Sequence, residues 1–367
     1  MPAFSPWRLK SRLESFTLLG CEAEPRERNE EPASSRRSGD GPEDCLRRLL
    51  LVRGVRAGGL GGVRRMPSRR GFNRQPQKRG RMMTIERLTT EAMLVEENWA
   101  AAWASLREAP VSPPTLVEET PNYLRIITPG VADSLLNIIM RYTAQRPVTR
   151  DDVEEAIAPF RRAHVPMQWW LMRGSEPAGL REQLALLGME SWGGAAAMTL
   201  RFDGWHPPTL ALAKGVTLGL AQGDEDRRAA LNIICAVFYA PLQPMNRWTI
   251  DNPRFTMYLA RLGGRPVAAL AIFTHQRIAG VYHVATLASA RRRGIAGALL
   301  TRALKDAQAA GCAYATLTAT PEAKHLYEQV GFTTCGVMEQ WSPGYRLAFS
   351  LVQGREPTLS ENPYWEG

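Results

Sequence analysis

VATLASARRRGIAGALL, residues 284–300, is the most informative segment of this chain. Its apolar start predicts a strand, the three arginines and Gly294 predict a turn, and the apolar residues after them predict a helix. Backbone N–H groups at a helix start, helped by the helix dipole, form a site for anions. Small residues in the turn let a pyrophosphate come close to those groups. The segment therefore predicts a site for a phosphorylated ligand, although a basic surface turn would have the same sequence pattern.

Two other phosphate-binding patterns do not fit this turn. The loop of a phosphate-loop ATPase ends in Gly-Lys-Ser/Thr, and that ending is absent here. A dinucleotide-binding turn has three spaced glycines and an acidic residue about 20 positions further on, and this turn has neither feature. The ligand class therefore has to be decided from the rest of the chain.

The positive charge of the chain is concentrated near its start. The whole sequence has a net charge of +10, and residues 1–81 alone contain 19 Lys/Arg and 9 Asp/Glu. The remaining residues are balanced, so the basic composition says nothing about the folded part. Residues 1–82 lack a periodic apolar pattern and are expected to be a disordered basic extension. This extension is either an arm for nucleic acid or an acidic partner, or a non-native stretch with translation starting at Met82 or Met83. We favour the second interpretation, because a sequence typical of ordered structure begins there.

The cysteines, hydropathy and composition point to a cytoplasmic protein. The chain has five scattered cysteines, without a CxxC pair or a His/Cys cluster of zinc spacing, which is typical of free thiols in a reducing compartment. It has no apolar run of about 18 residues, and its N-terminus lacks the apolar core of a signal peptide. We expect a monomer or homodimer with no metal and no membrane partner, and nucleic acid as a partner is disfavoured.

Two α/β units are expected in tandem. The first unit, residues 83–205, has a helical pattern over 84–107 and alternating strands and helices after it. The Trp169-Trp170 pair in it is more typical of a core than of a stacking platform. Residues 206–214, which include two prolines, form the expected linker. The second unit is expected over residues 215–352, with a polar tail over 353–367.

The second unit has clear boundary signals. Gly263-Gly264 predicts a hairpin between strands over 254–262 and 266–274. Gly311 is the expected end of the helix that follows the arginine turn, and Gly331 the end of the next one. The last two strands, which would close the sheet, are expected over 332–340 and 345–351.

These residues resemble the GNAT superfamily of N-acyltransferases over about 215–352. The acyl-CoA signature of that family, Arg/Gln-x-x-Gly-x-Gly/Ala, is matched by Arg291, Gly294 and Ala296. A second motif, Ala-x-x-Leu-Tyr-x-x-x-Gly-Phe, is matched with the expected helix and strand between the two by Ala323, Leu326, Tyr327, Gly331 and Phe332. The first unit is similar to the degenerate half of tandem GNAT proteins. It would form a wall of the substrate cleft or stabilise the catalytic half.

The resemblance implies the fold and the cofactor contacts. The fold would be α/β, with a mixed, mostly antiparallel sheet, flanking helices and two central strands that splay to admit acetyl-CoA. The pantetheine would pair with the strand backbone at Val284, Thr286 and Ala288. The pyrophosphate would lie on the turn, and the start of the helix after Thr320 would complete the cofactor contacts. The residues of these two contacts are Arg291, Arg292, Arg293, Gly294, Ile295, Ala296, Gly297, Thr320 and Ala323. Ala288 and Thr320 depart from the Pro and Asn that are frequent in the family.

The resemblance also implies direct acetyl transfer to an amine of a small molecule or a protein. Tyr327 would protonate the CoA thiolate as it leaves. A general base is needed because an ammonium group is not nucleophilic. Many relatives carry a Glu on the strand before the turn, but no acidic residue lies between Arg265 and Lys305. His283 is one candidate base, with a packed, hydrogen-bonded histidine as the other interpretation. Action through water by an acidic residue elsewhere is equally open, the candidates being Glu225, Asp226 and Glu339.

Two other function classes compete with this one. The missing strand carboxylate favours a non-catalytic acyl-CoA-binding regulatory module, whereas Tyr327 argues against it, since a binding module needs no acid for a thiolate. Nucleic-acid binding through residues 1–81 is a third hypothesis. The acceptor does not follow from the fold.

Overall fold

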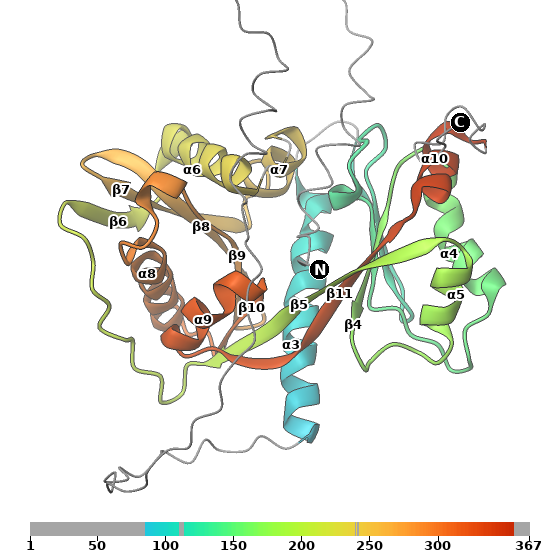
Figure 1. The fold of residues 1–367 in the computed structure, drawn as a ribbon, viewed down its shortest axis with the longest axis horizontal. Helices are drawn as coiled ribbons and strands as arrows, with labels where there is room; N and C mark the ends of the chain where they lie inside the picture. Colours follow the sequence, from blue (N-terminus) through green and yellow to red (C-terminus); the bar gives the residue numbers. More distant parts are fainter. Residues whose placement is uncertain (1–84, 110–113, 239, 241, 356–367) are drawn as a thin grey trace, which may run out of the picture. The chain divides into compact units, whose positions relative to one another are not determined.

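The computed structural model describes residues 85–109, 114–238, 240 and 242–355, and they belong to one compact unit. The predicted basic extension and the end of the predicted tail lie outside the described residues. Two halves follow each other along the chain, each with helices on both faces of its strands (Figure 1).

Each half contains both helices and strands. The first half contains α3 (Ile85–Ala104), β1 (Leu116–Glu119), β2 (Leu124–Ile127), β3 (Ile138–Met140), α4 (Arg150–Arg162), β4 (Gln168–Met172), α5 (Leu180–Leu186) and β5 (Met189–Arg201). The second half contains β6 (Val216–Leu220), α6 (Gly223–Phe238), α7 (Leu242–Thr249), β7 (Phe255–Leu262), β8 (Arg265–His275), β9 (Ile278–Thr286), α8 (Ile295–Ala309), β10 (Tyr314–Ala319), α9 (Pro321–Val330), β11 (Thr333–Pro343) and α10 (Tyr345–Gln353).

All these strands form one eleven-stranded sheet, in the order β1-β2-β3-β4-β11-β5-β10-β9-β8-β7-β6. Within the described residues the neighbours are antiparallel, except that β3 pairs with β4 and β9 with β10 in parallel. The fold is therefore α/β with a mixed, mostly antiparallel sheet and flanking helices, as the sequence predicts.

The last strand of each half completes the sheet of the other half. β5 lies between β10 and β11, and β11 lies between β4 and β5, so the two long strands cross the centre of the molecule (Figure 1). Each half consequently repeats one order: a parallel pair, then the exchanged strand, then its own last strand. The halves share backbone hydrogen bonds and cannot separate without breaking them.

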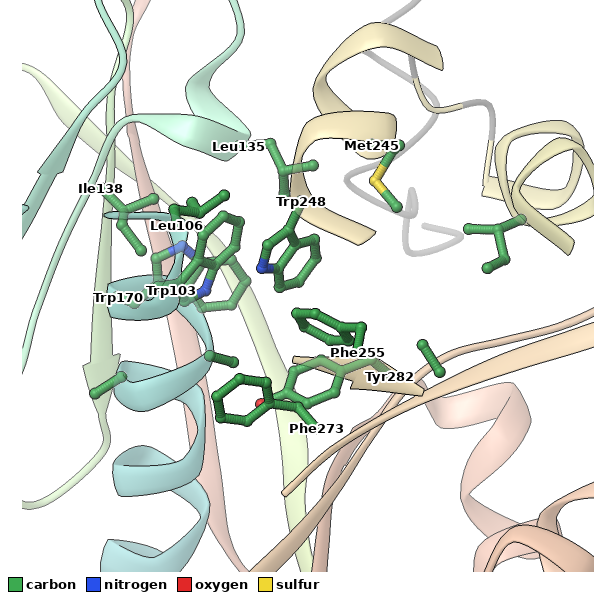
Figure 2. Packing of buried hydrophobic residues seen from close by; sticks show 14 of the residues in the cluster. Trp103, Leu106, Leu135, Ile138, Trp170, Met245, Trp248, Phe255, Phe273 and Tyr282 are labelled. Carbon is green, nitrogen blue, oxygen red and sulfur yellow. The ribbon is translucent and has the colours of Figure 1, made fainter. Parts of the chain in front are cut away.

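α3 of the first half packs into the second half. The Asn98 side-chain amide donates to the carbonyl oxygens of Phe273, at 3.3 Å, and Ile278, at 3.1 Å. Trp103 stacks on Trp248 of α7 with ring centroids 4.1 Å apart, and both side chains lie in a core cluster that draws on both halves (Figure 2). This helix therefore fixes the first half against the strands that carry the arginine turn.

Several expected elements are confirmed and others are wrong. The hairpin at Gly263-Gly264 is present, with Leu262 opposite Arg265, and Trp169 and Trp170 are buried as expected. Residues 345–351, expected as a strand, form helix α10. There Leu347 and Leu351, four residues apart, place one helix face on the cluster that contains α4. Helix α7 has no counterpart among the expected elements.

Candidate active site

The parallel strands β9 and β10 separate after a short contact. Their register covers three pairs, from Tyr314 opposite Ile278 to Thr316 opposite Gly280. Beyond this point β9 continues to Thr286 and β10 to Ala319, where β10 pairs with β5 alone. The carboxyl ends of the two strands are therefore splayed, which is the arrangement expected for the acetyl-CoA site.

A bulge in β9 lies at this opening. The register to β8 passes from Ala269 opposite Ala285 to Ala271 opposite Tyr282, so two residues of β9 face one residue of β8. One of the two is His283, whose φ of 55° lies in the left-handed region. Such a conformation is costly for a non-glycine residue and is often found at functional sites.

The turn after β9 leads into an uncapped helix. Gly294 is the N-cap of α8 with a φ of 74°, its first turn has no acidic residue, and no side chain caps it. The backbone N–H groups from Gly294 to Gly297 have no acceptor in the described part of the chain. Arg291, Arg292 and Arg293 are exposed beside them. The helix start combines free donors with three positive charges, as an anion site requires.

The small residues of this turn face the chain itself. A Cβ atom on Gly294 would lie 1.9 Å from the carbonyl oxygen of Ala211, in the linker. A Cβ on Gly297 would lie 2.8 Å from Cδ1 of Leu210 and 3.2 Å from Cδ1 of Leu326. The linker backbone therefore requires glycine at position 294, whereas a side chain at position 297 would displace the end of the Leu210 side chain. The sequence argument about a pyrophosphate did not include these contacts.

The remaining predicted cofactor residues border the opening. Val284 packs against the α8 side of the sheet, and the Arg291 guanidinium donates to the carbonyl oxygen of Thr286 at 3.0 Å. Ala288 starts a short 3-10 helix before the turn. Across the gap, Thr320 precedes Pro321, the first residue of α9, and the side chain of Ala323 packs against the same core cluster as Val284.

Tyr327 lies on α9 and is 6% exposed, with its ring packed edge-on against Phe332 and the ring centroids 6.1 Å apart. Burial raises the pKa of Tyr327 to about 12, so the phenol stays protonated near neutral pH. Its hydroxyl has no hydrogen-bond partner within the residues that the structure describes. The hydroxyl therefore carries a proton that it can donate, and its raised pKa makes it a weaker acid than an ordinary tyrosine.

His283 points toward α6 and α7. Its ring meets Trp248 edge-on at 4.7 Å and Phe238 at 6.2 Å. Burial lowers the pKa of His283 to about 3, and its Nε2 atom is buried without a hydrogen-bond partner. A base with so low a pKa is inefficient near neutral pH. The role of His283 as the base stays a prediction.

The alternative carboxylates differ in surroundings. Glu225 is exposed on α6, and Asp226 pairs with Arg261. Glu339 is 3% exposed and binds Arg173 and Arg181 of the first half. Although burial opposes it, hydrogen bonds from these two arginines hold the pKa of Glu339 below its usual range, which weakens it as a base.

Sequence reasoning missed two acidic residues of α3. Glu91 is 6% exposed and accepts a hydrogen bond from Oγ1 of Thr199 at 2.8 Å. Burial raises the pKa of Glu96 to about 7. The helical pattern placed both on one helix, but no sequence signal showed that this helix packs against β9 and β10.

The described residues offer neither a metal site nor a membrane-spanning helix. No group of three or more His, Cys, Asp or Glu side chains is arranged to hold a metal ion. No helix there combines the length and apolar character needed to cross a bilayer.

The residues of this site match a known protein family. Residues 229–332 match the model described as the acetyltransferase (GNAT) family, and this range contains the splayed strands, the arginine turn and Tyr327. These residues form a GNAT domain. No curated protein is significantly similar to the chain.

Solved GNAT structures cover both halves. A GCN5-related N-acetyltransferase from Kribbella flavida is 21% identical, with a TM-score of 0.55 over 69% of this chain and 98% of its own. One from Sphaerobacter thermophilus is 14% identical, with a TM-score of 0.46 over 70% and 96%. A tandem GNAT protein from the clavulanic acid biosynthesis pathway is 12% identical, with a TM-score of 0.43 over 68% and 94%. The likeness to the Kribbella flavida structure shows the fold.

Proposed function

We propose that this protein is an N-acetyltransferase that transfers the acetyl group of acetyl-CoA to an amine of a small molecule or a protein. The observation that carries the proposal is the uncapped, arginine-flanked start of α8 at the mouth of the splayed strands β9 and β10. It supplies backbone donors and positive charge for a pyrophosphate where the strand backbone is also open for pairing.

The residues of the GNAT domain divide the work. The backbone of Val284, Thr286 and Ala288 would hold the pantetheine, and the turn from Arg291 to Gly297 would hold the pyrophosphate. Thr320 and Ala323 would border the cofactor from α9. Acetyl-CoA supplies the thioester carbonyl that the neutral amine attacks.

Tyr327 completes the transfer by giving its proton to the CoA sulfur as the C–S bond breaks and the amide C–N bond forms. The acceptor ammonium has to lose a proton before the attack, and His283, Glu225, Asp226 and Glu339 are the proposed bases. The low pKa of His283 and the ion pairs of Asp226 and Glu339 leave Glu225 as the unpaired carboxylate of this set within the described residues.

A non-catalytic acyl-CoA-binding module is the second candidate function. It is favoured by the absence of acidic residues from Arg265 to Lys305 and by the low pKa of His283. A binding module, however, would have no role for the buried, protonated Tyr327.

The two functions are separated by following thiol release from acetyl-CoA with a panel of primary amines. We expect turnover with at least one amine, and a Tyr327→Phe variant slower by about 100-fold, the size typical of a lost general acid. Tyr314→Phe, at the opposite end of β10, is the matched control and should keep full activity. Binding of acetyl-CoA without thiol release for any amine would support the binding module instead.

A further inference from the structure

The linker between the two halves runs across the cofactor side of the GNAT domain. We call residues 206–214 the strap. Before it, the Trp205 indole N–H donates to the carbonyl oxygen of Val330, at the end of α9, at 2.9 Å. After it, the carbonyl oxygen of Gly215 accepts from the Gly263 amide at 3.0 Å. Both ends are thus fixed to the domain, and the strap spans from one side of α9 to the start of β6.

The middle of the strap lies on the arginine turn. Ala211 approaches Gly294 so closely that no Cβ atom would fit between them, and the Leu210 side chain lies against Gly297 of α8, where Leu326 of α9 is also close. The Ala213 amide donates to the carbonyl oxygen of Arg293 at 3.3 Å. The same turn, from Arg291 to Gly297, is the proposed site of the pyrophosphate.

Few interactions hold the strap between its ends. Within the described residues, the strap makes one hydrogen bond, from the Ala213 amide to the carbonyl oxygen of Arg293. Pro207 and Pro208 have no N–H group to donate. Leu212 is 39% exposed, so the apolar contact of the strap rests on Leu210. A segment tied at two ends and held by one leucine and one hydrogen bond can leave the surface locally.

We propose that the strap and the pyrophosphate of acyl-CoA exclude one another on the arginine turn, so that acyl-CoA binding lifts Leu210 to Leu212 off α8. The reason is electrostatic and steric. The Ala211 carbonyl oxygen carries partial negative charge and lies against Gly294, the residue at which the proposed phosphate site begins. This inference rests on the proposed acyl-CoA site. It adds that the linker regulates access to the site.

Calorimetric titration of acetyl-CoA into full-length variants tests the strap. Leu210→Ala removes the side chain that holds the strap against α8, so the affinity for acetyl-CoA should rise by about fivefold. Leu212→Ala removes an exposed leucine from the same segment and should leave the affinity unchanged. An unchanged or weaker affinity in Leu210→Ala would overturn the proposal, the weaker one showing that Leu210 is part of the binding wall.

Hydrogen exchange gives a second readout on the unmodified chain. On addition of acetyl-CoA, the amide of Ala213, which donates to Arg293 in the free protein, should exchange faster, while those of α8 become protected. Slower exchange of the strap would overturn the exclusion. If wild-type protein binds no acetyl-CoA at all, the proposed function fails together with the strap. If it binds while the strap does not respond, the strap proposal alone fails.

Discussion

α4 and α8 occupy equivalent places in the two halves and begin in opposite ways. Each follows the first strand of a parallel pair, β3 or β9, and precedes the second. At α4, Thr149 caps the helix and Asp152 bonds back to it in a capping box, with Arg146 paired to Asp152 at 2.7 Å. At α8, Gly294 provides no side chain and three arginines precede it. At the start of α4, side chains of the same helix start accept hydrogen bonds from the backbone N–H groups, whereas no side chain does so at the start of α8. The carboxylate of Asp152 therefore closes the first half to a phosphate.

The next helices of the two halves, α5 after β4 and α9 after β10, also differ at one position that matters for the proposed function. Gly188 and Gly331 follow α5 and α9 with φ values of 82° and 114°, as helix-ending glycines do. Four residues before these glycines stand Leu184 in the first half and Tyr327 in the second. The first half thus lacks both the open helix start and the tyrosine that we propose as the acid, which fits a stabilising role for it.

The largest expected effect comes from giving α8 the charge of α4. The second residue of α4 is Asp151 and the second residue of α8 is Ala296. An Ala296→Asp variant should bind acetyl-CoA about 100-fold more weakly, because a carboxylate next to the pyrophosphate costs about 2–3 kcal/mol. Calorimetry on the full chain measures this.

Ala296→Asp separates charge from misfolding better than a change at Gly294. An acidic residue in the first turn favours the helix dipole, so the melting temperature should not fall. A side chain on Gly294 would instead meet Ala211 and strain the backbone. Unchanged acetyl-CoA affinity in Ala296→Asp would show that the start of α8 is not the phosphate site.

A middle-sized effect concerns the helix that joins the halves. Burial is the main cause that raises the pKa of Glu96, to about 7; the nearby Arg141 lowers it and Glu97 raises it. The folded state therefore holds this proton more tightly than the unfolded state, and the stability falls as the pH rises from about 4.5 to about 7. Glu96→Gln should remove that loss and gain on the order of 2 kcal/mol over wild type at pH 8.

Urea unfolding at pH 5 and pH 8 checks this expectation. The gain from Glu96→Gln should be much smaller at pH 5, where the wild-type carboxyl is largely protonated. Glu108→Gln, in an exposed ion pair with Arg254, is the control and should change little. An equal effect of Glu96→Gln at both pH values would contradict the raised pKa of Glu96.

The smallest effect tests the closed helix start. Asp152→Ala removes the capping box of α4 and should cost about 1 kcal/mol of unfolding free energy near neutral pH. Hydrogen bonds from Arg146 and then Thr149 hold the pKa of Asp152 below its usual range, so the contribution is present near neutral pH and is lost on acidification. Acetyl-CoA affinity should not change, and a loss of affinity would mean that the first half shapes the cofactor site.

The sequence predicted what is encoded locally. The arginine turn, the glycine pair at Gly263-Gly264 and the position of Tyr327 follow from residues a few places apart. It did not predict the exchange of β5 and β11, because strand pairing across the centre depends on contacts between distant residues. The contact of Ala211 with Gly294, 83 positions apart in the sequence, was missed for the same reason. Residues 345–351 were assigned to a strand because an apolar run that short fits either element.

The central claim is that one of two equivalent helix starts binds acyl-CoA. Calorimetric titration of acetyl-CoA into the full-length protein tests it most directly, because it gives both affinity and stoichiometry. We expect one site per chain, lost or strongly weakened in Ala296→Asp and retained in Asp152→Ala. Two sites per chain, or no binding by the folded wild-type protein, would contradict it.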